Sequence, residues 1–299
     1  MEIPRGREVI EIRNRNDGRG FSRQVGEVES FNRAGLVLKT SDGTTTIAAH
    51  LVSQIHYQKS DEHRLGDLHF RQKNFRDALT HYKKARALAD RQWVEVQLME
   101  QTIRCESALG FHSQAISDFT ALAELEPEMA DSTFACIPLA WQAIPGDVRI
   151  EETAARLLRA NANVPVEVVL CGSYLLFSPQ MKEVPQRMKI FASNRDERLA
   201  QMAEAQTWRL ELTTVTPEKA AQWRDRIETF PPELRGGPCF VLGRAFLNLK
   251  DFDSAALAFL KTALVYDQNP ALAAEALRLA QTSLEQGGHP EEAKALKKD

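Results

Sequence analysis

The stretch LGDLHFRQKNFRDALTHYKKA, Leu65–Ala85, decides how most of this chain is interpreted. In it, Gly66 is followed after twelve residues by Ala78, and then by Tyr82 and Ala85. Small residues at Gly66 and Ala78 allow two antiparallel helices to approach closely, while the ring of Tyr82 fills the groove beside them. The stretch therefore predicts a pair of packed helices, and the question is whether this pair is repeated.

The second-helix spacing returns in ALGFHSQAISDFTALAELEPE, residues 108–128. There Ala115, Phe119, Leu122 and Pro127 follow one another as Ala78 and its successors do. Self-similarity at a period of about 34 residues is the sequence signature of a helical-hairpin array. This second copy therefore favours an array over a single helix pair.

Two more copies lie near the end of the chain. Gly243 is followed by Ala255 at the same distance of twelve residues, and then by Phe259. Beyond Phe259 the pattern fits only after a shift of one residue, through Ala263. A truncated fourth copy places Ala293 at the small-residue position.

These residues resemble the tetratricopeptide repeat (TPR) family, whose signature is Trp-x2-Leu-Gly-x2-Tyr, then Ala-x3-Phe, then Pro. The chain departs from it in places: Glu62 stands at the Trp position of the first copy, and Thr102-Ile103 replaces Leu-Gly in the second. The resemblance implies a mainly α protein, a right-handed α-solenoid of about seven helix pairs. The predicted helical-repeat domain is 59–299, with clear repeats at 60–128 and 236–299 and degenerate helix pairs at 130–235.

Three helix pairs are expected within the degenerate region. The valine-rich run VPVEVVL, 164–170, is predicted to be helical because it continues into CGSYLLF. Tryptophans spaced helically from Leu and Ala are interpreted as packing anchors, namely Trp141, Trp208 and Trp223. The expected pairs are 131–143 with 147–161, 165–177 with 181–192, and 194–213 with 217–230.

Residues 1–58 have a different sequence pattern, which consists of short runs rich in Val, Ile, Leu and Thr. Asp42-Gly43 lies between two such runs and predicts a hairpin, because Gly accepts the positive φ of a tight turn. Five short antiparallel strands in this length predict a small β-barrel domain, which resembles SH3-like or Sm-like barrels.

Composition narrows the classes of function. The 299 residues are 43% hydrophobic and 26% charged, which is typical of a folded protein, and the net charge of -3 gives no basic footprint for nucleic acid. Arg5-Gly6 and Arg19-Gly20 have acidic neighbours, which argues against RNA binding. No apolar run is long enough to span a membrane, and the start has no secretory leader, so a cytoplasmic protein is expected; an exported one is the alternative if a leader has been removed. The four separated cysteines are predicted to be core residues: Cys105, Cys136, Cys171 and Cys239.

No motif for a cofactor, a nucleophile or a phosphate loop occurs, so neither a cofactor nor an enzyme is predicted. His63 and Asp67 lie one helical turn apart and could both reach one metal ion. No third ligand is placed by spacing, and a metal site is therefore not predicted.

In TPR proteins the first helix of each pair lines a groove that grips a peptide or a partner helix. The resemblance thus implies a non-enzymatic protein-binding scaffold, with oligomerisation through the terminal repeats left open. One alternative makes the N-terminal barrel the binding module, for RNA or a Pro-rich peptide, with the solenoid as spacer; another is an enzyme with its site in 130–235. The candidate partner-binding residues are His63, Asp67, Phe70, Arg71, Gln97, Glu100, Arg104, Arg244, Leu247 and Asn248, with Phe70 and Arg104 as anchors.

Overall fold

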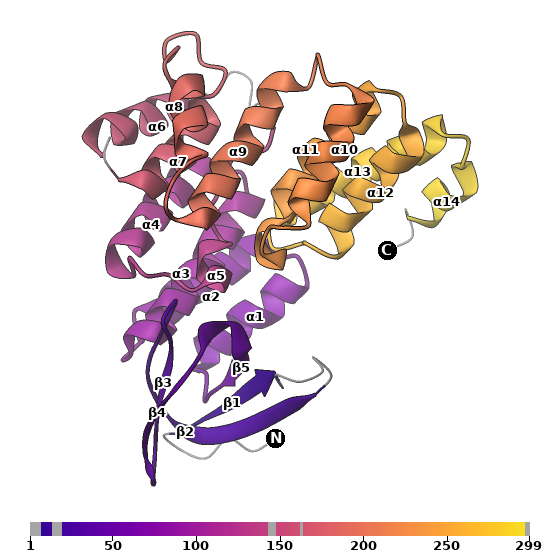
Figure 1. The fold of residues 1–299 in the computed structure, drawn as a ribbon. Helices are drawn as coiled ribbons and strands as arrows, with labels where there is room; N and C mark the ends of the chain where they lie inside the picture. Colours follow the sequence, from indigo (N-terminus) through magenta and orange to yellow (C-terminus); the bar gives the residue numbers. More distant parts are fainter. Residues whose placement is uncertain (1–6, 14–19, 143–147, 162–163, 297–299) are drawn as a thin grey trace. The chain divides into compact units, whose positions relative to one another are not determined.

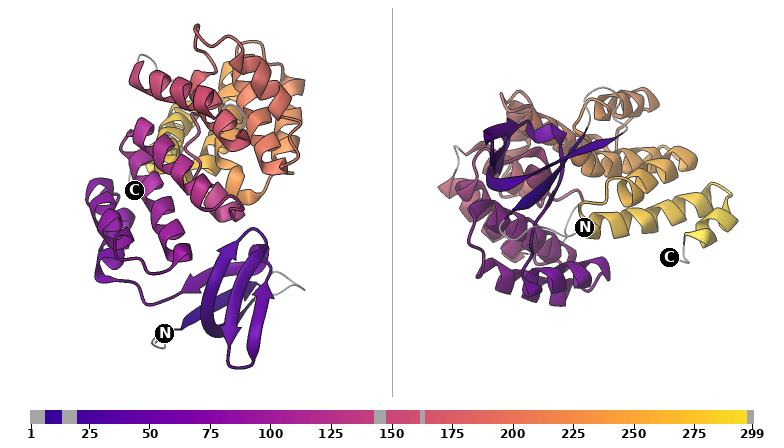
Figure 2. Two further views of the ribbon diagram at one scale, coloured as in Figure 1. Left: turned by 90° about the vertical axis from the view of Figure 1, so that its left-hand side faces the viewer. Right: turned by 90° about the horizontal axis from the view of Figure 1, so that it is seen from below.

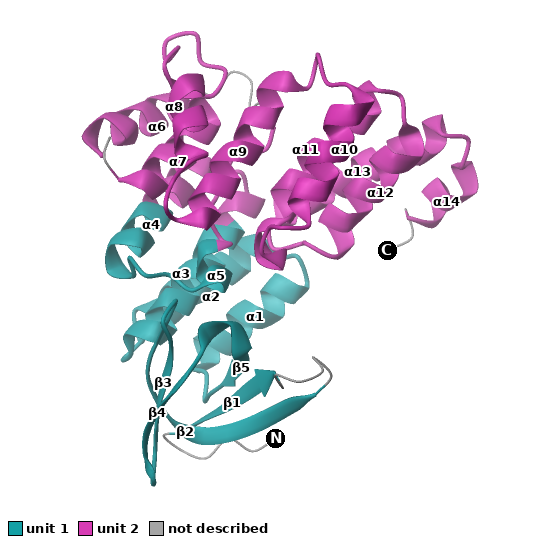
Figure 3. Ribbon diagram, in the orientation of Figure 1, with its two compact units in different colours: residues 1–105, 118–134 teal, residues 106–117, 135–299 magenta. Residues whose placement is uncertain are grey.

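The computed structural model describes residues 7–13, 20–142, 148–161 and 164–296 (Figure 1). The chain divides into two compact units (Figure 3). Unit 1 comprises Met1–Cys105 and Asp118–Phe134, and unit 2 comprises Glu106–Ser117 and Ala135–Asp299. Arg5, Gly6 and Arg19, which were considered for RNA contact, lie outside the described residues.

Unit 1 begins with an antiparallel sheet of five strands in the order β4-β3-β2-β1-β5. Residues 21–26 of β2 pair with β1, and residues 27–32 pair with β3, so one long strand joins both parts of the sheet (Figures 1 and 2). The predicted hairpin at Asp42-Gly43 is confirmed, because Thr40 pairs with Gly43 across it. The strands are β1 Glu8–Arg13, β2 Phe21–Asn32, β3 Gly35–Thr40, β4 Gly43–Ile47 and β5 Val52–His56.

The sheet is open, and the prediction of a closed barrel is wrong for the described residues. Closure would require the outer strands β4 and β5 to pair with each other. Instead β4 pairs only with β3, and β5 only with β1. A short 3-10 helix, Ala49–Leu51, turns the chain between the two outer strands. Strands β4 and β5 therefore remain the two edge strands of the sheet.

The sheet is bonded to the helices of unit 1 through a buried carboxylate. Glu8 is 1% exposed and accepts a hydrogen bond from the backbone N–H of Val28 at 2.7 Å. It also forms an ion pair with Arg91. Trp93 donates its indole N–H to the Val28 carbonyl at 3.1 Å and packs edge-on against Tyr57, with 4.9 Å between ring centroids. Sheet and helix thus share one core.

The rest of unit 1 is helical, and the helices begin after Tyr57, where the strand-like sequence pattern ends. Ser60 caps the first helix by accepting a hydrogen bond from the N–H of His63. The predicted helix pair of the opening stretch is confirmed, since α1 packs on α2. The helices are α1 Asp61–Arg71, α2 Phe75–Arg86, α3 Gln92–Ala108, α4 His112–Leu125 and α5 Asp131–Phe134; α3 and α4 each extend into unit 2.

Unit 2 continues the helical pattern, and most of the predicted helices are found within a few residues of their expected ends. The valine-rich run is helical, as predicted, and lies in α7. Trp208 stacks on Trp223 with 5.1 Å between ring centroids, and both are buried, which confirms their role in packing. The helices are α6 Val148–Ala160, α7 Pro165–Leu175, α8 Val184–Phe191, α9 Glu197–Glu211, α10 Pro217–Ile227, α11 Gly236–Asn248, α12 Phe252–Leu264, α13 Pro270–Gln286 and α14 Pro290–Ala295, with a 3-10 turn at Pro232–Leu234.

One predicted helix is largely missing. Residues 131–143 were expected to form it, but the helix ends at Phe134. Pro138 explains the difference, because proline has no N–H to donate and its ring clashes with the preceding turn of a helix. Residues 136–141 are nevertheless buried, so an irregular segment crosses the interior of unit 2.

Four helix pairs share the same connecting turn. In each, the residue five positions before the small alanine has a positive φ: 60° at Lys73, 74° at Gly110, 61° at Lys250 and 86° at Gly288. The next N–H then bonds to the carbonyl five residues back, which is the hydrogen bond of a Schellman helix end. These bonds are Asn74 to His69 (2.9 Å), Phe111 to Glu106 (2.8 Å), Asp251 to Phe246 (3.0 Å) and His289 to Leu284 (2.8 Å).

Two of these turns hold a lysine in a conformation that favours glycine, which allows a stability prediction. A left-handed conformation costs an L-residue about 1 kcal/mol or more. We therefore expect Lys73→Gly and Lys250→Gly each to raise the free energy of unfolding by about 1 kcal/mol, measured by chemical denaturation of the full chain. Gly110→Ala is the reverse control: its Cβ would meet open space, so a loss of similar size would come from the backbone alone. No gain at either lysine would show that the turns are not strained.

The first helix of two pairs approaches the second through a glycine. A Cβ added to Gly66 would lie 2.6 Å from the ring of Tyr82, and one added to Gly243 would lie 2.7 Å from the ring of Phe259. The spacing of glycine and ring is the same in both pairs. Beyond Phe259 no shift of register is needed, because Thr262 is 1% exposed and occupies the small-residue position, which had been given to Ala263.

All four cysteines are buried, as the sequence predicted. Among the described residues, no helix is both long and apolar enough to cross a lipid bilayer.

Candidate functional site

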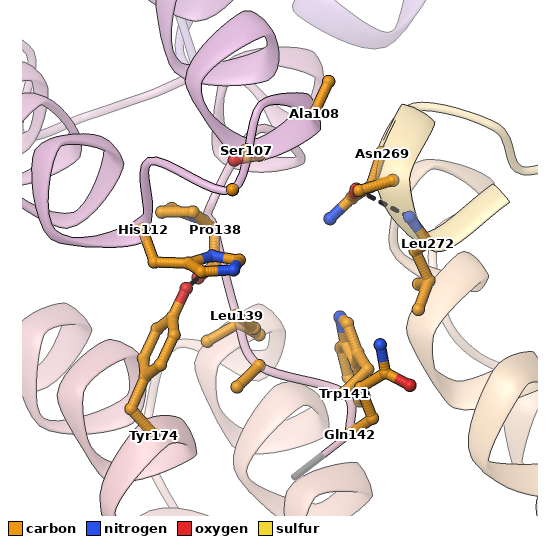
Figure 4. Close-up of a pocket in the computed structure, with 13 residues that line it drawn as sticks. Ser107, Ala108, His112, Pro138, Leu139, Trp141, Gln142, Tyr174, Asn269 and Leu272 are labelled. Atoms are coloured by element: carbon orange, nitrogen blue, oxygen red, sulfur yellow. Dashed lines mark hydrogen bonds between the residues drawn. The ribbon is translucent and has the colours of Figure 1, made fainter. Parts of the chain in front are cut away.

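The irregular segment 136–142, called the strap from here on, lies beside a pocket in unit 2 (Figure 4). A buried segment without helical hydrogen bonds needs other partners for its backbone groups. Helix α7 provides two of them. The hydroxyl of Tyr174 donates to the Pro138 carbonyl at 2.6 Å, and the N–H of Ala140 donates to Ser173 Oγ at 3.0 Å.

Arg209, on α9, bonds both to the strap and to Ser173 of α7. Its Nη1 donates to the carbonyl oxygens of Ala140, at 2.6 Å, and Ser173, at 2.9 Å. It also donates to the side-chain oxygen of Gln206, and its Cζ lies 5.3 Å from the ring centroid of Phe177. Arg209 is 5% exposed and pairs with no carboxylate among the described residues. Burial lowers the pKa of Arg209 to about 10, so the group stays charged at neutral pH.

Trp141 fixes the far end of the strap against α11. A Cβ added to Gly237 would lie 1.8 Å from the indole, so the indole occupies the space that any larger residue would need. Cys136 and Ile137 are buried at the near end. The strap is therefore held along its length, by backbone bonds in the middle and by apolar contacts at both ends.

The pocket beside the strap has a volume of about 360 Å³. Four parts of unit 2 that are distant in sequence surround it: the turn between α3 and α4, the strap, α7 and the start of α13. Its lining residues are Ser107, Ala108, Gly110, His112, Pro138, Leu139, Ala140, Trp141, Gln142, Tyr174, Asn269, Ala271 and Leu272.

The pocket lining contains no Asp, Glu, Lys or Arg, and burial raises the pKa of Tyr174 far above neutral pH. The rings of His112 and Tyr174 lie 5.9 Å apart on one side. On the other side, Asn269 caps α13 by accepting from the N–H of Leu272 at 3.1 Å. The Asn269 nitrogen and the indole nitrogen of Trp141 point into the pocket (Figure 4). The site thus combines apolar walls with neutral hydrogen-bond donors.

Of the first two residues predicted to bind a partner, His63 is part of the unit 1 core and Asp67 is half-buried. His63 is 3% exposed, with Nδ1 3.0 Å from the Tyr57 hydroxyl and Nε2 3.6 Å from Asp67 Oδ1. Burial lowers the pKa of His63 to about 4, so the imidazole is neutral. Asp67 accepts from Lys59 at 2.6 Å and from the Tyr82 hydroxyl at 2.9 Å. His63 therefore does not face solvent. No group of three or more His, Cys, Asp or Glu able to hold a metal ion occurs in the described parts of the chain.

Helix α3 contributes three more of the predicted residues. Glu100 is buried, accepts from the Thr133 hydroxyl at 2.6 Å, and has a pKa raised by burial. Like His63, it is closed to a partner in this structure. Arg104 differs, because its Nε is buried without a hydrogen-bond partner among the described residues, while the side chain as a whole is half-buried. Gln97 is also half-buried.

The other predicted residues lie at or near the surface. Phe70 packs edge-on against Phe75 with 5.4 Å between ring centroids, and Arg71 is exposed. On α11, the exposed Asn248 donates to the Leu212 carbonyl at 2.8 Å. Arg244 and Leu247 are half-buried.

None of the ten predicted residues lines the pocket. The pocket residues come from four separate segments, and no spacing in the sequence connects them. One signal was present: Pro138 in the middle of a predicted helix indicates an irregular segment, and a buried irregular segment is a place where a pocket can form. Trp141 was identified only as a packing residue.

No protein-family model matches the chain, and a search of curated proteins found no match. The function is therefore inferred from the geometry of the pocket and the strap.

Proposed function

We propose that this chain is a non-enzymatic, TPR-like binding protein whose unit 2 pocket holds an uncharged peptide segment of a partner protein. The observation that carries the proposal is the pocket lining, which joins aromatic and aliphatic walls to the N–H groups of Trp141 and Asn269 and contains no Asp, Glu, Lys or Arg. Pockets that recognise ligands are commonly apolar, with a few placed polar groups that fix orientation.

Pocket size favours a segment over a single small side chain. A dry cavity of about 150 Å³ accommodates one benzene molecule. A pocket of about 360 Å³ has room for more than one side chain of a peptide. A charged residue would lose its hydration there without gaining an ionic partner, which costs several kcal/mol. An uncharged segment is therefore the ligand that fits the chemistry.

The lining also favours binding over catalysis. General acid–base chemistry needs groups whose pKa lies near the working pH. The ionisable side chains of the lining are His112 and Tyr174, and the raised pKa of Tyr174 removes the second of them from this range. The proposed protein therefore acts by holding its partner.

The shared turns and the two glycine–ring contacts support the TPR-like part of the proposal. Four turns with the same φ sign and the same backbone bond are what one repeated unit would give. We include in the proposal the right-handed stacking of about seven helix pairs. Asp67, Phe70, Arg71, Gln97 and Arg104 on the first pairs, and Arg244, Leu247 and Asn248 on α11, stay predicted partner contacts.

A tryptophan placed at the pocket rim tests the proposal. Peptides would be selected on the full chain from a displayed library of random sequences, and their affinities measured by calorimetry. Ala271 lines the pocket, so we expect Ala271→Trp to weaken their binding at least about tenfold, which corresponds to about 1.4 kcal/mol.

Ala274→Trp is the matched control, because Ala274 is exposed on the same helix and does not line the pocket. It should leave affinity unchanged. Selection that yields no binding peptide, or peptides equally sensitive to both variants, would contradict the proposal.

A further inference from the structure

Two backbone groups of the strap point away from Ser173 and Arg209, which bind its other side. In a trans peptide the C=O and the N–H lie on opposite sides of the unit, and the described chain has no cis peptide. The Ala140 N–H is bonded to Ser173 Oγ, and the Ala140 C=O to Arg209, which also bonds the Ser173 carbonyl. The opposite ends of the same two peptide units, the Leu139 C=O and the Trp141 N–H, therefore face the other way.

Neither of these groups has a hydrogen-bond partner among the described residues. The Leu139 N–H is already used, because it donates to the Ile137 carbonyl at 2.9 Å. Leu139 and Trp141 both line the pocket. The strap thus presents an acceptor and a donor, two residues apart, on the side opposite Ser173 and Arg209.

This pair of groups matches one edge of a β-ladder. In parallel pairing, each residue of the neighbouring strand lies opposite one residue of the first strand. It donates to the C=O of the residue that precedes this opposite residue, and it accepts from the N–H of the residue that follows it. Here the opposite residue is Ala140. An α-helix uses its backbone groups internally and cannot offer this pair.

We propose that the partner segment binds as an added strand on the strap, paired with the Leu139 C=O and the Trp141 N–H; this rests on the proposed peptide-binding function. A ligand that covers the pocket excludes water from both groups. Each would then be left unpaired at a cost of about 1–3 kcal/mol unless the ligand bonds to it. An extended polypeptide, with backbone groups of both kinds on one edge, satisfies both at once.

Backbone methylation of a selected peptide tests the mode of binding. Each N–H of the peptide would be replaced in turn by N-methyl, and affinity for the full chain measured. Strand addition predicts an alternating pattern, since successive N–H groups point to opposite edges. We expect a loss of about tenfold or more where the N–H faces the strap, and little change at neighbouring positions.

Amide exchange of the protein gives a second readout. Labelling tryptophan with nitrogen-15 yields at most four backbone amide signals, because the chain has four tryptophans. Peptide binding should slow exchange of the Trp141 amide at least about tenfold, the change that one hydrogen bond of about 1.4 kcal/mol gives. The buried Trp208 and Trp223 amides, within helices α9 and α10, should not change.

The outcomes separate the two proposals. Pocket-dependent peptides that tolerate methylation at every position, or that leave the Trp141 amide unprotected, would overturn strand addition and keep peptide binding. Absence of any peptide sensitive to Ala271→Trp would overturn both.

Discussion

Replacing Arg209 with methionine is expected to lower the free energy of unfolding of unit 2 by about 3 kcal/mol. The substitution keeps a long apolar side chain but removes the donors to the carbonyl oxygens of Ala140 and Ser173. Hydrogen bonds from a charged group contribute about 1.5–3 kcal/mol each, and the abandoned acceptors stay buried. Removing the buried charge is itself favourable and offsets part of this loss. The expected loss of stability is therefore smaller than the summed energies of the hydrogen bonds.

Arg226→Met is the matched control. Arg226 pairs with Glu204 on the neighbouring helix at 2.8 Å, but its side chain is 40% exposed. Exposed ion pairs contribute about 1 kcal/mol or less, so this variant should be nearly as stable as the parent chain. Chemical denaturation of the full chain measures both. Equal losses for the two arginines would show that the strap does not depend on Arg209.

Replacing Trp93 with alanine is expected to cost roughly 3–5 kcal/mol and to unfold the sheet together with the first helices. Trp93 is 4% exposed and connects α3 to the sheet through its bond to Val28 and its contact with Tyr57. Since these contacts cross between sheet and helices, the two parts of unit 1 should lose structure in one transition.

Trp93→Phe keeps an aromatic ring in the core but removes the indole N–H and part of the ring volume, so most of the packing is retained while the hydrogen bond is lost. It should cost about 1–2 kcal/mol. Circular dichroism at wavelengths sensitive to strand and helix would follow both parts. Loss of the sheet signal alone in Trp93→Ala, with the helices intact, would mean that the sheet and the helices of unit 1 unfold independently, and would favour the N-terminal sheet as a separate binding module.

Local sequence patterns predicted most of the helices, because their causes are local. The spacing of Gly66, Ala78 and Tyr82 requires two close helices, and the structure contains that contact. The same reasoning failed at 131–143, because the prediction did not take Pro138 into account and the helix ends at Phe134. Barrel closure also failed, since it depends on pairing between the outer strands, which are not adjacent in sequence and carry no signal for it.

The site was harder to predict, because it depends on contacts between distant segments. The residues were chosen from the family resemblance, by their position on the first helix of each pair. The resemblance gives no information about which of them are buried. His63 and Glu100 consequently proved to be core groups, held by Tyr57 and Thr133. The pocket instead depends on where the strap crosses α7 and α11, and the sequence does not encode this in any short spacing.

The most direct test of peptide binding in the pocket is the ratio of peptide affinities between the Ala271→Trp and Ala274→Trp chains. The two substitutions add the same side chain to the same helix, and only Ala271 lines the pocket. Peptide binding in the pocket predicts a ratio of about tenfold or more, with Ala274→Trp equal to the parent chain. Equal affinities for the two variants would place the peptides elsewhere and contradict the proposed function.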